Sequence, residues 1–196
     1  HLTAAEAIKM GLSRDGGLFT PERFPSLTEE EIRSLCPMTY QQRAALVMGK
    51  FLDDFTAEEL ESFAASAYSE EKFDTPAVAP LRQVGGSTWC LELWHGPTSA
   101  FKDMALQMLP LLLSASLRKT GEDKTACILV ATSGDTGKAA MEGFADVPQT
   151  KIMVFYPRDG VSEIQKLQMV TQEGENVGVC AVQGNFDDAQ TGVKRI

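Results

Sequence analysis

A single lysine, Lys102, stands where a loop turns into an apolar helix in the stretch HGPTSAFKDMALQ, residues 95–107. The positive end of a helix dipole and burial among apolar neighbours both disfavour an ammonium ion, so they lower the pKa of a lysine. A lysine that loses its proton readily can form a Schiff base with an aldehyde and can then act as a base. The local sequence also allows a simpler interpretation, in which Lys102 faces solvent and pairs with Asp103.

A second candidate site is the stretch ATSGDTGKAA, residues 131–140, in which small residues join an expected strand to an expected helix. The pair Gly137-Lys138 resembles a nucleotide-binding P-loop. That motif, however, needs Gly at the position of Thr132 and Ser or Thr at the position of Ala139, so an ATP or GTP site is disfavoured.

A loop of small residues before a helix can still bind a carboxylate or a phosphate, because backbone N–H groups and the helix dipole favour an anion there. The candidate ligands are the side chains of Ser133 and Thr136 and the amides of Gly134 and Gly137. A tight turn with Asp135 as an ordinary helix cap explains the same residues equally well. The local sequence leaves both interpretations open.

The elements that must position these residues change in character near residue 81. Residues 1–80 are expected to be mainly helical, because a hydroxyl residue is followed three positions later by Glu at Thr3/Glu6, Thr28/Glu31 and Thr56/Glu59. The segment STWCLELW then predicts a strand, which is followed by a loop and by a helix that reaches about Lys119.

Three short apolar runs, TACILVAT, TKIMVFYP and NVGVCAVQ, predict buried parallel strands that alternate with helices. The helices are expected at KAAMEGFA, from a capping box at Ser162/Gln165 to Gly174, and from near Asp187. This alternation predicts an α/β fold with an open parallel sheet and helices on its faces. Ligands of such sheets bind at the carboxyl ends of the strands, where the loops SGDTG and GNFDD are expected.

The composition, 43% hydrophobic and 23% charged over 196 residues, is that of a globular protein of one or two domains. A net charge of −9 argues against a nucleic-acid partner. No membrane span or signal peptide is predicted, because the longest apolar stretch is interrupted by Pro110, Arg118 and Lys119. The sequence contains two histidines, His1 and His95, so no histidine-rich metal site is predicted. Four scattered cysteines without a C-x-x-C pair favour free thiols in the cytoplasm, although disulfides remain open.

Four motifs, DGGLFTPERFP, LWHGPTSAFKDMALQ, ATSGDTGKAA and GNFDDAQ, occur in this order, and together they resemble the amino-terminal part of the threonine synthase family. The resemblance extends over essentially all residues. It implies a fold type II enzyme, similar to the β subunit of tryptophan synthase, with pyridoxal 5'-phosphate as its cofactor. It also implies a lyase of threonine biosynthesis that converts O-phospho-L-homoserine and water into L-threonine and phosphate.

The same resemblance assigns roles to residues. Lys102, in the FKD motif, corresponds to the catalytic lysine that carries the cofactor. The SGDTG loop is implied to bind substrate, through Ser133, Gly134, Asp135, Thr136 and Gly137. Asp135 is also implied to lie beside the cofactor, at the position where related loops have Asn.

The resemblance further implies three regions: a mainly helical region at 1–80, a strand, loop and lysine-bearing helix at 81–120, and a βαβαβ part of a small α/β domain at 121–196. We expect the chain to be a fragment, because it begins without Met and ends on the helix-like TGVKRI. A carboxy-terminal half would then hold the cofactor's phosphate loop and the partner of its pyridine nitrogen. Monomer and dimer both remain open.

Two other functions remain open. A phospho-lyase with the same motifs would release a 2-oxo acid and ammonia, and a catalytically silent fragment or regulatory homologue would do no chemistry. Lys138 either pairs with the substrate phosphate or lies on the helix surface, which the sequence favours. His95 is expected to orient its own loop through hydrogen bonds.

Overall fold

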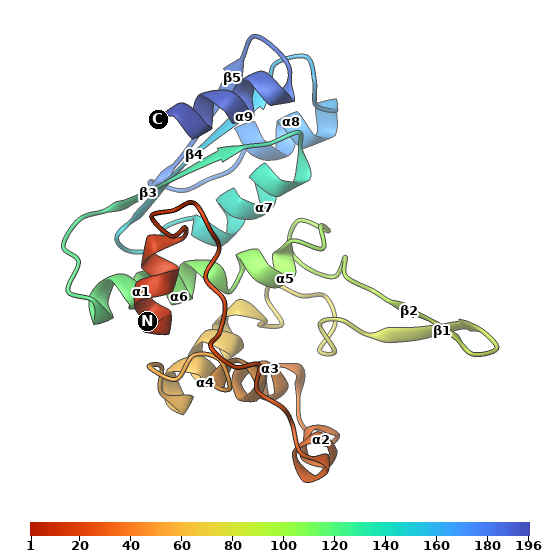
Figure 1. Cartoon of the computed structure of the whole chain (residues 1–196). Helices are drawn as coiled ribbons and strands as arrows, with labels where there is room; N and C mark the ends of the chain where they lie inside the picture. Colours follow the sequence, from red (N-terminus) through yellow and green to blue (C-terminus); the bar gives the residue numbers. More distant parts are fainter.

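The computed structural model describes residues 1–196 and begins with four helices (Figure 1). These are α1 (Ala4–Met10), α2 (Glu29–Leu35), α3 (Tyr40–Gly49) and α4 (Ala57–Ala67). The three predicted capping boxes are present at the starts of α1, α2 and α4. Thr39 and Gln42 form a fourth at the start of α3, where the same spacing is present in the sequence but was not predicted.

The helical region has its own hydrophobic core, to which α4 contributes one face. Leu60, Ala64 and Ala67 of α4 are buried against Phe55 and Tyr68, as the helical spacing of these apolar residues predicts. The core also includes residues of the later helix α6, so the first third of the chain is packed onto the segment that follows Lys102.

The strand predicted in STWCLELW is present but has a different setting. Strand β2 (Thr88–Leu91) pairs antiparallel with β1 (Leu81–Gly85), and the two form an exposed hairpin apart from the parallel sheet (Figure 1). The two-residue turn is Gly86-Ser87, and Gly86 has a positive φ of 49°. A Gly-Ser pair between two β-rich runs is a hairpin signal, and it identifies the missed partner strand.

The single helix predicted up to Lys119 is two helices, α5 (Asp103–Leu106) and α6 (Leu109–Lys119). Pro110 is the second residue of α6. Because proline has no backbone N–H and its ring excludes a preceding helical turn, it fits the first turn of a new helix and not the middle of a long one. The break gives α5 only a single turn.

The predicted parallel sheet is confirmed, with strands β3 (Ala126–Ala131), β4 (Thr150–Pro157) and β5 (Val177–Val182) side by side in chain order. Helices α7 (Asp135–Phe144) and α8 (Glu163–Val170) cover one face, where Met141, Phe144, Ile152, Val154 and Met169 form a second core. Helix α9 (Phe186–Arg195) contacts β3 and β4 from the other face (Figure 1).

Three helices differ slightly in their bounds from the sequence expectation. Helix α7 begins at Asp135, three residues before the predicted KAAMEGFA, and ends at Phe144. Helix α8 ends at Val170 and not at Gly174, and α9 begins one residue earlier, after the cap Asn185. None of the helices combines the length and the hydrophobicity that crossing a membrane requires.

Candidate functional site at the junction of α5 and α7

Lys102 is the residue immediately before α5, as predicted, and its amine meets the SGDTG loop. The Lys102 Nζ lies 3.1 Å from Oδ2 of Asp135, the first residue of α7. The same Nζ lies 4.4 Å from the centre of the Phe101 ring. The Lys102 side chain is 28% exposed, so a small molecule can reach the amine. Two motifs that are separated by 33 residues in sequence are therefore joined by one ion pair.

The simpler interpretation, in which Lys102 pairs with Asp103, is wrong. The Asp103 carboxylate is fully buried and accepts hydrogen bonds from the backbone N–H (2.9 Å) and the hydroxyl (2.6 Å) of Thr98. Burial raises the pKa of Asp103. A side chain at Gly96 would collide with this carboxylate, because an added Cβ would lie 2.6 Å from Oδ2. Asp103 thus holds the HGPT loop and leaves the Lys102 amine to Asp135.

The SGDTG loop is organised by Thr132, which the sequence analysis considered only as a mismatch to the P-loop. Its Oγ1 accepts hydrogen bonds from the amides of Gly134 (3.0 Å) and Gly137 (2.9 Å). The two glycine amides that were candidate anion ligands are therefore bound within the loop. Gly134 has φ of 151°, a conformation that residues with a Cβ rarely adopt.

Replacing Thr132 with valine is expected to lower the free energy of unfolding by about 3 kcal/mol, because two buried N–H groups lose their acceptor. Valine keeps the shape of the threonine side chain, so the loss of stability measures the contribution of the hydroxyl group. Thr132→Ser, which retains the hydroxyl and loses one methyl group, is the matched control and is expected to cost about 1 kcal/mol. Urea unfolding measures both, and equal losses in the two variants would contradict the assigned role.

The remaining predicted residues do not all lie at the contact between Lys102 and Asp135. Ser133 is exposed. Thr136 is half-buried, and together with Lys102 it lines an open cavity next to the site. Lys138 points elsewhere: its Nζ donates to Glu142 (3.1 Å) and to Gln172 beyond the end of α8. The substrate-binding roles of the loop residues stay predictions, whereas Lys138 is engaged in the contact between α7 and α8.

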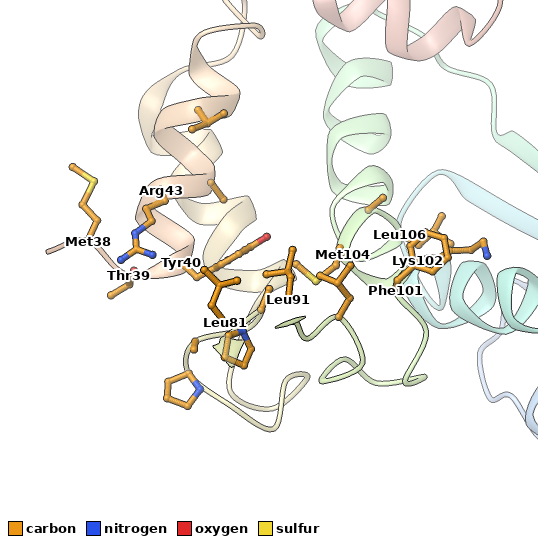
Figure 2. A pocket seen from close by; sticks show the side chains of 18 of the residues that line it. Met38, Thr39, Tyr40, Arg43, Leu81, Leu91, Phe101, Lys102, Met104 and Leu106 are labelled. Atoms are coloured by element: carbon orange, nitrogen blue, oxygen red, sulfur yellow. The ribbon is translucent and has the colours of Figure 1, made fainter. Parts of the chain in front are cut away.

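An open cavity of about 1360 Å³ lies next to the junction, between α3, the hairpin and α5. Its lining is mostly apolar and includes Tyr40, Leu81, Leu91 and Met104 (Figure 2). Lys102 lies at one end of the cavity, and its amine points away from the apolar part (Figure 2). The polar chemistry is thus concentrated where Lys102 meets α7, and the cavity provides an apolar flank.

Comparisons with known proteins show what the chain is similar to. A family model described as the threonine synthase N terminus matches residues 1–68. A threonine synthase of Pseudomonas aeruginosa is 44% identical over 194 residues, which are 98% of this chain and 40% of that protein. Human threonine synthase-like 1 is 38% identical over 200 residues, which cover 98% of this chain and 26% of that protein.

A solved structure, the pyridoxal-phosphate-bound threonine synthase from Brucella melitensis, matches with a TM-score of 0.92 and 39% identity, over 99% of this chain and 41% of that chain. This likeness confirms the predicted fold type II architecture. The chain spans about two-fifths of the length of these threonine synthases. Over nearly all of its residues the chain is similar to the amino-terminal part of threonine synthases.

Proposed function

We propose that this chain supplies the lysine-bearing part of a pyridoxal-phosphate-dependent threonine synthase, which converts O-phospho-L-homoserine and water into L-threonine and phosphate. The observation that carries the proposal is the contact between the Lys102 amine and Asp135, because it joins the FKD and SGDTG motifs in one site. The names of the relatives support the same activity.

The residues at the junction fit the cofactor in their chemistry. An aldehyde needs a primary amine that it can reach, and Lys102 is partly exposed. The Phe101 ring is an apolar neighbour of this amine, and the Asp135 carboxylate is a polar one. The Thr136 hydroxyl supplies a second polar group, because Thr136 lines the same cavity as Lys102. Lys102 would therefore hold the cofactor's aldehyde carbon, with Asp135 at its side.

Pyridoxal phosphate, when bound, withdraws electrons and stabilises negative charge on the substrate carbons near the amino group. Lys102 is the base that we assign to the proton transfers at Cα and Cβ of the substrate, since its amine is at the centre of the junction. One proton is taken from Cα and one from Cβ, phosphate leaves Cγ, and Cγ gains a proton. Water then adds its hydroxyl at Cβ, and Cα regains a proton, which gives threonine. Ser133 and Thr136 are the side chains that we assign to the substrate.

The proposal extends to the cell compartment and to partners. We infer a cytoplasmic enzyme of amino-acid biosynthesis, supported by four cysteines that are all free and by the net charge of −9. Its partner is a small molecule, and neither nucleic acid nor a membrane is needed for the chemistry.

The activity is tested in a chimaera in which this chain replaces the equivalent residues of the Pseudomonas aeruginosa relative. With O-phospho-L-homoserine and pyridoxal phosphate, the chimaera is expected to form threonine and phosphate in equal amounts. Release of a 2-oxo acid and ammonia in place of threonine would support the phospho-lyase instead. A folded chimaera that binds the cofactor and forms neither product would support a silent homologue.

A further inference from the structure

His95, in the motif HGPT, lies between two carboxylates. Its Nδ1 is 2.6 Å from Oδ1 of Asp74, and its Nε2 is 2.8 Å from Oε2 of Glu92. Ionised carboxylates only accept hydrogen bonds, so both ring nitrogens have to carry a hydrogen for both contacts to form. A neutral imidazole has one such hydrogen. The geometry therefore corresponds to the imidazolium form of His95.

The cluster joins three segments of the chain. Asp74 follows α4 and also donates its backbone N–H to the His95 carbonyl (3.1 Å). Glu92 follows β2, and its carboxylate lies 3.7 Å from Nε of Arg82 on β1. The Trp94 ring stacks on the His95 ring with 5.6 Å between centroids. The side chains of His95 and Glu92 are 14% and 16% exposed, so solvent screens this pair less than a surface pair.

The loop from residue 96 to Lys102 is held by two sets of contacts. Asp103, just after the loop, accepts two hydrogen bonds from Thr98, and its buried carboxylate also lies against Gly96. At the near end, the contacts of His95 attach the loop to the hairpin and to the segment after α4. No other side-chain hydrogen bond or ion pair joins residues 95–97 to those two segments.

We propose that His95, as an imidazolium ion bridging Asp74 and Glu92, is a positioning residue that fixes the loop presenting Lys102. The role of Lys102 in this statement rests on the proposed function, whereas the bridge itself does not. The charged groups that face His95 are Asp74 from the segment after α4 and Glu92 at the end of β2, with Arg82 of β1 beyond Glu92.

The bridge makes the placement of the loop depend on pH. Hydrogen bonds to the two carboxylates raise the pKa of His95 above its ordinary value of 6.5. A group with a raised pKa contributes its full stabilisation below its ordinary pKa and loses it as the pH rises through the raised value. The loop is therefore held most firmly at mildly acidic pH, below the ordinary pKa of histidine, and is released as the pH rises through the raised pKa of His95.

The bridge is tested by NMR of the imidazole nitrogens. At neutral pH His95 is expected to have both nitrogens protonated, and its pKa is expected to lie above the ordinary value of 6.5. Asp74→Asn and Glu92→Gln are each expected to lower the pKa of His95, because each removes one carboxylate that stabilises the imidazolium ion. A single protonated nitrogen in wild-type His95 at neutral pH would overturn the proposal.

The positioning role is tested by hydrogen exchange at the Thr98 amide in wild type and in His95→Gln, which is uncharged and can donate to only one carboxylate. Exchange is expected to be about ten-fold faster in the variant at mildly acidic pH, and the ratio should approach one as the pH rises through the pKa of His95. Taking the ratio cancels the intrinsic pH dependence of exchange. A ratio that does not change with pH would contradict the role.

A second comparison, between the rates at which Lys102 is modified in wild type and in His95→Gln, tests whether the loop positions Lys102. In the chimaera, borohydride trapping of pyridoxal phosphate on Lys102 is expected to be about ten-fold slower in His95→Gln at mildly acidic pH, and the difference should vanish at alkaline pH. Comparing the two proteins at the same pH isolates the effect of His95. A rate difference that persists unchanged at alkaline pH would overturn the pH-dependent positioning. Absence of trapping in both proteins would instead contradict the proposed function, and the Thr98 exchange would still decide the role of His95.

Discussion

Replacing Lys102 with alanine is expected to lower the threonine-forming activity of the chimaera by more than about 10³-fold, because Lys102 is proposed to be both the cofactor's anchor and the proton-transferring base. The fold should persist, since the Lys102 side chain is partly exposed and its one ion pair is at the edge of a cavity. Activity with O-phospho-L-homoserine and far-ultraviolet circular dichroism measure the two properties side by side.

Two further lysine variants give this prediction its controls. Lys102→Arg keeps a positive charge for Asp135 but has no primary amine, so it is expected to be as inactive as the alanine variant. Lys138→Ala removes a lysine of α7 that contacts Glu142 and Gln172, and it is expected to leave KM and inhibition by phosphate unchanged. Substantial activity in Lys102→Arg would contradict the covalent role, because charge alone would then be sufficient.

Replacing Gly143 with alanine is expected to lower the free energy of unfolding by about 3 kcal/mol. Gly143 is the point at which α7 touches α5: an added Cβ would lie 1.9 Å from the backbone carbonyl oxygen of Leu106. Relief of this overlap requires the two helices to move apart. Because Lys102 immediately precedes α5 and Asp135 begins α7, the same movement is expected to separate the ion pair of the site.

Gly192 of α9 provides the matched control. It is also a glycine inside a helix, but an added Cβ there has no heavy atom within 4 Å. Gly192→Ala is expected to raise the free energy of unfolding by about 0.5–1 kcal/mol, through the higher helix propensity of alanine. Urea unfolding of both variants separates the two effects. If Gly143→Ala were also stabilising, the close approach of α5 and α7 would be contradicted.

Much of the fold could be predicted from short-range patterns. The apolar run of β4 matches the strand in the structure from Thr150 to Pro157, because the central strand of a parallel sheet with helices on both faces has few polar positions. The capping boxes fix the starts of α1, α2, α4 and α8, because two hydrogen bonds within four residues determine each of them. These signals are local, and tertiary packing did not override them.

The missed features depend on the chain as a whole. The sequence argument for a strong helix dipole at Lys102 assumed one long helix, whereas α5 has a single turn before the break ahead of Pro110. The ion pair with Asp135 joins elements 33 residues apart and has no local signal. The role of Thr132 depends on the folded loop, in which the amides of Gly134 and Gly137 both donate hydrogen bonds to its hydroxyl. The spacing of residues in the sequence does not reveal this pattern.

The resemblance and the structure support the site in different ways. The order of the four motifs implied a pyridoxal-phosphate lysine at position 102, and the structure independently brings this amine to the SGDTG loop. Physical reasoning from the sequence had suggested a reactive amine but could not separate it from a surface lysine. In the structure the Asp103 carboxylate is bound by Thr98, and the Lys102 amine pairs with Asp135 instead.

Covalent binding of pyridoxal phosphate by Lys102 can be measured by locating the bound cofactor. The chimaera is incubated with pyridoxal phosphate, reduced with borohydride, digested and analysed by mass spectrometry. The peptide containing Lys102 is expected to carry the adduct, and the other lysines, including Lys138, are expected to remain largely unmodified. An adduct concentrated on another lysine, or spread evenly over the exposed lysines, would contradict the role of Lys102.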